Sequence, residues 1–224
     1  MRLAYPALLE VLPIDGYYIS CLVIENKRLF RALLCDAASA IDGNKTDLVL
    51  SDGDRILDMT KHAEILSDFI CFDLNRKTLL NKIVGEMEKI AVSPEHYMKT
   101  RELLTDIESS ISEWAFSFPC DIVAGKISVS TLLKSVGIEL RDEYEGHRGE
   151  VEKILDYMEL VREFDRNKLF ITVNMRSFFE DELITEFMKT VVSHEYRVLM
   201  IESNAYPKLP LEKRITIDAD LCEF

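Results

Sequence analysis

Residues 168–179 read KLFITVNMRSFF, a basic residue followed by an apolar run that stops at an amide. The run Leu169–Val173 is continuously apolar, which is typical of a strand covered on both faces of a parallel sheet. In nucleotide hydrolases a buried strand of this kind often ends in an acidic residue that holds Mg²⁺ through water. Here that position is the amide Asn174. The stretch therefore predicts an α/β fold that is similar to nucleotide hydrolases but lacks their acidic residue at this position.

Strand and helix patterns alternate on both sides of this stretch. After it we expect a helix over residues 178–195 and a strand over residues 196–203. A connection this short predicts a parallel pair of strands. Earlier in the chain, a strand over Tyr17–Ile24 is followed by a helix over residues 25–40 that ends near Gly43. Shorter strands are expected at residues 47–51 and 214–218.

The middle of the chain shows only helical patterns. Helices are expected at residues 78–90, from Ser93 onward, at 130–136 up to Gly137, and around 151–161. The second carries apolar residues at alternate spacings of three and four, a coiled-coil-like seam of Leu104, Ile107, Ile111, Trp114 and Phe118. We therefore expect an α/β head built from residues 1–80 and 148–224, with an α-helical leg inserted at residues 81–147.

Composition limits the classes of protein. The chain has 224 residues and a net charge of −13, from 27 Lys and Arg against 40 Asp and Glu. A nucleic-acid-binding protein with this charge must concentrate its cations on one surface or recruit a metal ion. The first fifteen residues are not a secretion signal and no apolar run could span a bilayer, so we expect a cytoplasmic protein without a membrane partner. The five cysteines lack metal-ligand spacing, and we expect free thiols, with Cys21 and Cys71 buried in strands.

No catalytic signature is present. A phosphate loop needs the pattern G-x-x-x-x-G-K-[ST], whereas Ile24 is followed by ENKRLFRA, which contains no glycine. The four histidines are scattered, and no serine lies in a G-x-S-x-G motif. Asp218 and Asp220 alternate along the last predicted strand, where we expect a solvated edge rather than a metal site. We therefore expect that the protein is not an enzyme.

One group of basic residues is placed where α/β proteins bind ligands. Lys27, Arg28 and Arg31 begin the first predicted helix, just past the carboxyl end of a strand. Free amides at the helix N-terminus would add to an anion site there. Arg55 and Lys61 flank the next connection. The alternative interpretation is a solvated helix face without a ligand.

The ordered set of segments resembles one known family. SDFICFDLNRKTLLNKIVGEME (67–88), STLLKSVGIEL (130–140) and KLFITVNMRSFFEDELITEFMK (168–189) fall in its order and spacing, and the tail RITIDADL completes the match. The family is the accessory adaptation protein of type II-A CRISPR systems, called Csn-two. The resemblance covers nearly the whole chain and lies in the set of segments rather than in any single motif.

The resemblance implies a fold and a function. Family members have a head similar to P-loop ATPases without a working phosphate loop, together with a helical leg. They form a ring-shaped homotetramer whose positively charged hole takes up double-stranded DNA ends without sequence preference. They act in spacer acquisition, beside the CRISPR adaptation integrase proteins and the effector nuclease, and are not known as enzymes.

The chain departs from the family at its calcium-binding loop. Here that loop reads FPCDIVAGKIS, residues 118–128, and only Asp121 keeps an acid. Family positions that carry acids are here Pro119, Val123, Gly125, Lys126 and Thr131. Calcium prefers six to eight oxygen ligands, so the loop predicts a poor site, and Lys126 offers a fixed charge in place of part of the ion.

The family's basic loop is also reduced here, since it retains only Arg55 and Lys61 in DGDRILDMTKH. We therefore expect DNA contacts at Lys27, Arg28, Arg31, Arg55, Lys61 and Lys126. The sequence also allows two alternatives to a DNA-binding protein. One is a degenerate nucleotide-fold ATPase or phosphohydrolase, and the other is a protein-interaction scaffold that does not contact DNA.

Overall fold

The computed structural model describes all 224 residues. The chain divides into two compact units, the first made of Met1–Phe72 and Glu143–Phe224 and the second of Asp73–Asp142. The first unit contains every strand and the second contains only helices and coil. The division at residues 72/73 and 142/143 lies within eight residues of the boundaries expected from the sequence.

A five-stranded parallel sheet forms the centre of the first unit, with strand order β6-β7-β8-β3-β9. Its strands, in the order of the chain, are β3 (Ile19–Ile24), β6 (Ala63–Leu66), β7 (Leu169–Val173), β8 (Arg197–Glu202) and β9 (Glu212–Ile217). The parallel pairing of β7 with β8 confirms the crossover expected from the sequence, with Ile171 opposite Leu199. The strands follow one another across the sheet in chain order, except that β3 lies between β8 and β9.

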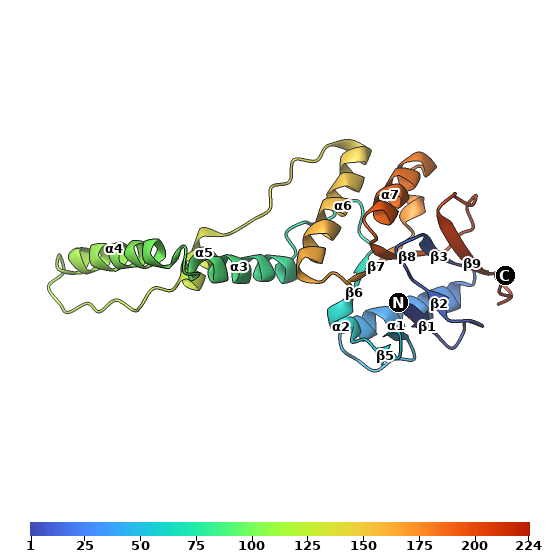
Figure 1. Cartoon of the computed structure of the whole chain (residues 1–224), viewed down its shortest axis with the longest axis horizontal. Helices are drawn as coiled ribbons and strands as arrows, with labels where there is room; N and C mark the ends of the chain where they lie inside the picture. Colours follow the sequence, from blue (N-terminus) through green and yellow to red (C-terminus); the bar gives the residue numbers. More distant parts are fainter. The chain divides into compact units, whose positions relative to one another are not determined.

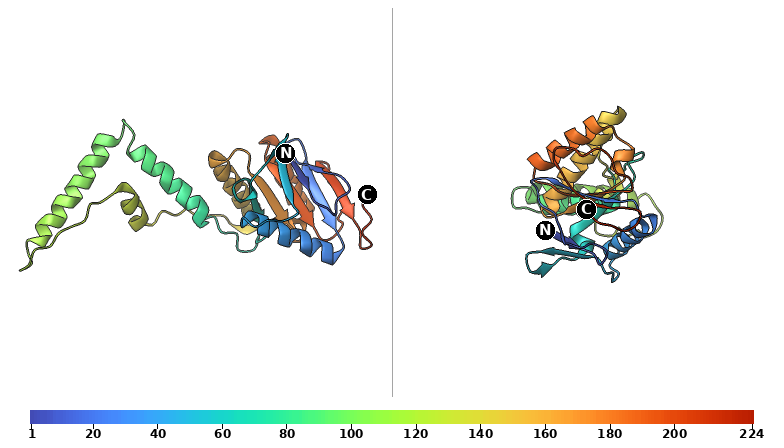
Figure 2. Two further views of the ribbon diagram at one scale, coloured as in Figure 1. Left: turned by 90° about the horizontal axis from the view of Figure 1, so that it is seen from below. Right: turned by 90° about the vertical axis from the view of Figure 1, so that its right-hand side faces the viewer.

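Helices cover both faces of this sheet (Figures 1 and 2). On one face lie α6 (Gly146–Phe164) and α7 (Asp181–Ser193), and on the other lie α1 (Lys27–Ile41) and the single turn α2 (Met59–His62). Every residue of β3 is buried, as the continuous apolar pattern predicted. Its alternate residues Leu22 and Ile24 belong to the core on the α1 side, together with Leu33 and Ala37 of α1.

A second, antiparallel sheet was not predicted as a separate layer. Its order is β2-β1-β4-β5, from β1 (Arg2–Ala4), β2 (Leu12–Pro13), β4 (Val49–Asp52) and β5 (Arg55–Ile56). These strands are two to four residues long, too short for a periodic pattern to show in the sequence. Leu3, Leu12 and Leu50 place this sheet in the same core as α1.

The second unit contains α3 (Lys77–Ala91), α4 (Tyr97–Ala115) and α5 (Val129–Val136). Gly137 ends α5 at φ = 74°, a conformation that favours glycine, as the sequence indicated. The helix cap expected at Ser93 is wrong by three residues, since the cap of α4 is His96. Ser93 Oγ contacts His96 Nδ1 instead of capping a backbone amide, and residues 93–96 form a turn that precedes α4.

Two further expectations are corrected. Cys71 is exposed, because the strand β6 ends at Leu66 and residues 67–76 form loops and turns; all five cysteines are free, and Cys21 is buried. β9 ends at Ile217, so Asp218 and Asp220 do not alternate on a strand. The Asp218 carboxylate instead accepts hydrogen bonds from the amides of Asp220 and Cys222, both at 2.9 Å.

None of the helices is both long enough and apolar enough to cross a membrane.

Candidate nucleic-acid interface

The start of α1 lies at the carboxyl edge of the parallel sheet, two residues after β3 ends at Ile24. Asn26 caps the helix: its Oδ1 accepts hydrogen bonds from the amides of Arg28 and Leu29, both at 3.1 Å. Its Nδ2 donates to the Ala219 carbonyl at 2.8 Å, which fixes the tail beside the helix start. The expectation of free helix amides is therefore wrong for these two groups, since the cap already uses them.

Three side chains at this helix start form what we call the α1 cationic patch, namely Lys27, Arg28 and Arg31. All three are exposed, none has an ion-pair partner, and the first turn of α1 contains no acidic residue. Cations at a helix N-terminus are repelled by the positive end of the helix dipole. The arrangement is electrostatically unfavourable by itself and becomes favourable when an anion is bound.

The structure separates this patch from two other predicted site residues. Arg55 lies on β5 and Lys61 on α2, both exposed, and Lys61 Nζ lies 3.7 Å from an Asp58 carboxylate oxygen. α2 lies near the opposite end of α1, since a Cβ on Gly43 would come within 3.5 Å of Thr60. Fifteen residues of helix span roughly 22 Å, so Lys61 lies near the opposite end of α1 from the α1 cationic patch.

The remaining predicted residues, Asp121 and Lys126, belong to the second unit. Both are exposed in the coil between α4 and α5. The Glu108 carboxylate on α4 also contacts this coil, where it accepts a hydrogen bond from the Ile127 amide at 3.3 Å. No group of three or more His, Cys, Asp or Glu side chains that could hold a metal ion occurs in the chain. Asp121 is the single carboxylate of residues 118–128, so this coil offers few of the six to eight oxygen ligands that calcium prefers, and a poor calcium site stays a prediction.

Asn174, the amide that replaces an acid, has a structural role at the carboxyl edge. It adopts the left-handed conformation (φ = 52°), which Asn tolerates better than most residues. Its amide donates to the Ile201 carbonyl at 2.8 Å, and its Oδ1 accepts from the Ser203 amide at 2.8 Å. Asn174 thus ties the end of β7 to the end of β8.

A buried ionic cluster beside Asn174 was missed by the sequence analysis. Arg176 lies between two carboxylates: its Nη2 donates to Asp181 at 2.6 Å, and its Nη1 is 3.6 Å from Glu212. Glu212 also accepts from Arg214 Nε at 2.5 Å. The residues of the cluster come from the turn after β7, the start of α7, β8 and β9, and no local sequence pattern relates these elements.

Glu202 completes this cluster at the end of β8 and is 1% exposed. Burial raises its pKa from 4.5 to about 7, although the Arg176 amide, which donates to its Oε1 at 3.2 Å, acts in the opposite direction. Its second oxygen, Oε2, has no hydrogen-bond partner. A carboxyl with one unsatisfied buried oxygen is held closer to its neutral form, so Glu202 titrates near neutral pH.

The fold and the absence of a phosphate loop define a class: an α/β protein with a parallel sheet, helices on both faces and a separate helical unit. The model of the CRISPR-associated protein family Cas_Csn2 matches residues 40–221, and the chain belongs to this family. This is the family that the sequence resembled, and membership gives the protein a CRISPR-associated role.

A solved structure supports the fold. The crystal structure of Stu0660 of Streptococcus thermophilus is similar over 97% of this chain and 75% of that chain, with a TM-score of 0.62 and 13% sequence identity. At this identity the likeness concerns the fold alone. No curated protein matches the sequence.

Proposed function

We propose that the protein binds the ends of double-stranded DNA without sequence preference and without catalysis, during CRISPR spacer acquisition. The observation that carries this proposal is the α1 cationic patch, three unpaired cations gathered at the positive end of a helix. In a chain with a net charge of −13, such a concentration of unpaired cations is suited to a phosphate backbone. Because the chain belongs to a CRISPR-associated family, we take DNA to be the polyanion that this patch binds.

The proposed mode of binding is phosphate contact. Lys27, Arg28 and Arg31 are long, exposed side chains on the first helical turns. We propose that they contact phosphates and do not read base edges. Phosphate contacts position a duplex but carry no sequence information. Affinity should therefore depend steeply on salt and little on sequence.

A single patch of three cations supplies few phosphate contacts, so we propose that several copies bind together as a ring-shaped homotetramer. Exposed apolar side chains in the second unit support assembly through that unit, since such surfaces commonly mark interfaces. They include Trp114 (66%), Phe116 (88%) and Val123 (91%). The ring would act beside the CRISPR adaptation integrase proteins and the effector nuclease.

The proposal assigns no hydrolysis to the carboxyl edge. The connection between β3 and α1 has two residues, Glu25 and Asn26, too few to wrap around a phosphate group. Two helix amides are used by the Asn26 cap, and Asn174 is occupied by the Ser203 amide. These contacts weigh against the ATPase or phosphohydrolase alternative, whose direct test is ATP turnover by the purified protein.

A gel shift that compares linear with closed circular duplex tests the proposal. We expect binding of linear duplex, weakened by salt, with no shift of closed circles. Equal binding of both forms would remove the end-binding model, and no binding of either would favour the protein-interaction scaffold. Added calcium or chelator should leave the shift unchanged, because we expect a poor calcium site at residues 118–128, where Asp121 is the only carboxylate.

A further inference from the structure

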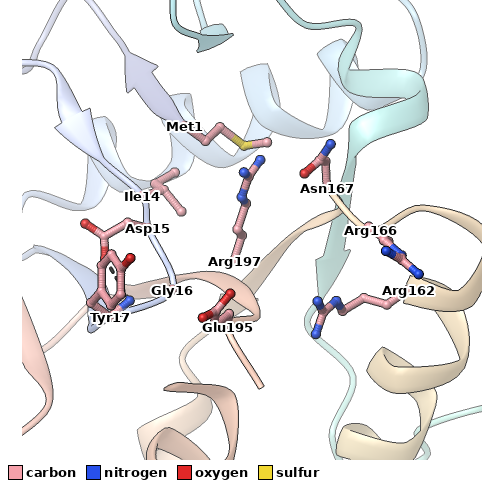
Figure 3. Close-up of a pocket in the computed structure, with 10 residues that line it drawn as sticks. All are labelled: Met1, Ile14, Asp15, Gly16, Tyr17, Arg162, Arg166, Asn167, Glu195 and Arg197. Carbon is pink, nitrogen blue, oxygen red and sulfur yellow. Dashed lines mark hydrogen bonds between the residues drawn. The ribbon is translucent and has the colours of Figure 1, made fainter. Parts of the chain in front are cut away.

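A pocket of about 340 Å³ lies at the amino edge of the parallel sheet, which is the opposite edge from the α1 cationic patch. Arg197 begins β8, Asn167 lies just before β7, and the segment Asp15–Tyr17 precedes β3. Figure 3 shows Arg197 in the middle, with Asp15 and Tyr17 on one side and Arg162, Arg166 and Asn167 on the other. Its volume lies within the usual range of small-molecule sites, about 300–1,000 Å³.

Three guanidinium groups line this pocket and differ in how far they are already engaged. Arg162 donates to the His194 carbonyl at 2.5 Å and stacks on the Tyr196 ring at 4.6 Å. Arg197 has one contact, at 3.4 Å, with the Asp52 carboxylate. Arg166 is exposed and has no partner. Arg166 and most of the Arg197 donors are therefore available to an anion, and guanidinium is well matched to phosphate oxygens.

On another side of the pocket, the backbone at Gly16 lies close to the backbone at Glu195. A Cβ on Gly16 would lie 2.8 Å from Glu195 Cα, so only glycine fits at this position. Glu195 itself adopts φ = 56°, a conformation that costs energy for this residue type. The turn before β8 and the segment before β3 are thus held together, and the pocket exists without a ligand.

The remaining lining groups favour a ligand that is more than a bare anion. Glu195 and Asp15 contribute carboxylates, which repel a polyanion but accept hydrogen bonds from sugar hydroxyls. Asp15 already accepts from the Tyr17 amide at 2.9 Å, whereas Glu195 is exposed. Tyr17 is 76% exposed, so its ring is accessible for stacking by a planar base.

We propose that this pocket binds a nucleoside phosphate, with Arg166 and Arg197 on the phosphate, Glu195 on the ribose hydroxyls and Tyr17 against the base. The shared chemistry is a terminal phosphate, which a free nucleotide or a 5′-phosphorylated DNA end could supply. We assign the free nucleotide, because the carboxylates and the ring match a sugar and a base next to the phosphate. The assignment is independent of the proposed DNA-binding function and involves no bond cleavage.

Calorimetric titration of the full chain tests this assignment with three probes: adenosine diphosphate, inorganic pyrophosphate, and a short duplex with 5′-phosphates as competitor. Adenosine diphosphate should bind, and pyrophosphate should bind more weakly. Arg166→Gln should weaken nucleotide binding about tenfold or more, since a charged hydrogen-bonding partner of phosphate is lost. Tyr17→Ala should weaken the nucleotide but not pyrophosphate. The control Lys208→Gln removes an exposed charge outside the pocket and should change nothing.

Several results would overturn the assignment. These are no nucleotide binding at millimolar concentration, unchanged affinity in Arg166→Gln, or pyrophosphate binding as tightly as the nucleotide. Displacement of the nucleotide by the 5′-phosphorylated duplex would show that the phosphate comes from DNA ends. Gel shifts with Arg166→Gln distinguish failure of the nucleotide assignment from failure of the proposed DNA binding. Duplex binding at the α1 cationic patch should be unaffected by this substitution.

Discussion

At the scale of single residues, Asn174 shows how a functional interpretation of the sequence becomes a structural one. The missing acid indicated lost chemistry. The structure shows what the amide does instead: it holds the Ser203 amide at the end of β8 in a backbone conformation that suits Asn. The hydrogen bond between Asn174 and Ser203 could not be predicted from KLFITVN, because the two residues lie 29 positions apart in the chain.

Asn174→Ala should destabilise the protein by about 2 kcal/mol. The substitution removes the acceptor for the Ser203 amide. It also places alanine in the left-handed region, where alanine lacks the side-chain hydrogen bonds that make this conformation tolerable for Asn. Asn174→Gly is the matched control, since it loses the same acceptor but tolerates the conformation. Its loss should be about half as large. Urea denaturation measures both, and equal losses would show that the backbone conformation contributes nothing.

Glu202 should make stability depend on pH. Its pKa in the folded protein, about 7, lies above its ordinary value of 4.5, so the folded state binds the proton more tightly. The stabilisation from this group is complete below about pH 4.5 and is lost as the pH rises through 7.

Glu202→Gln should therefore raise the free energy of unfolding at pH 8, by at most about 3 kcal/mol, and raise it less at pH 5. Denaturant melts across this range check the slope. Glu163→Gln, an exposed carboxyl on α6, should leave the slope unchanged. A wild-type slope retained by Glu202→Gln would assign the titration to another group.

At the scale of elements, α1 is where sequence and structure agree best. Its helical spacing and its end near Gly43 were predictable, because both depend on neighbouring residues. The sequence also placed Lys27, Arg28 and Arg31 at its start. It could not show that Asn26 occupies two of the helix amides, or that Lys61 of α2 lies near the other end of α1.

Replacing Lys27, Arg28 and Arg31 by Glu should abolish duplex binding in gel shifts. The helix should not lose stability, since carboxylates at a helix N-terminus are favourable by about 0.3–1 kcal/mol each. Thermal melting therefore separates lost binding from lost folding.

A second triple variant controls for net charge, since Lys45, Lys189 and Lys208 are exposed lysines on other elements. Their replacement by Glu changes the net charge equally and should retain binding. Equal loss in both variants would mean that total charge, rather than the α1 cationic patch, governs the interaction.

At the scale of the whole molecule, the second unit leaves its apolar residues uncovered. No residue of α4 is buried, although the sequence showed a coiled-coil-like seam there. Leu104, Ile107 and Ile111 are only half-buried, and Trp114 is exposed. A seam without a partner in its own chain is consistent with the proposed assembly.

Phe116→Ser combined with Val123→Ser should shift the protein toward smaller species in light scattering, while the melting of the first unit is unchanged. Burial of large apolar side chains is worth about 1.5–3 kcal/mol each, so the assembly constant should fall at least about tenfold. Leu9→Ser removes an equally exposed side chain (82%) from the first unit and should leave assembly intact. A shift with Leu9→Ser alone would place the interface elsewhere.

Hydrophobic periodicity and glycine spacing are local properties of a chain, so the sequence alone was enough to predict β3, β7, β8 and β9, the main helices and the lack of a phosphate loop. It also carried enough ordered similarity to identify the family. Only the tertiary structure decided which distant residues meet: Glu202 with Arg176, Asn174 with Ser203, and Arg197 with Arg162 around a pocket. Such contacts join residues from different strands and helices, and their geometry depends on how the sheet orders its strands, which no local pattern encodes.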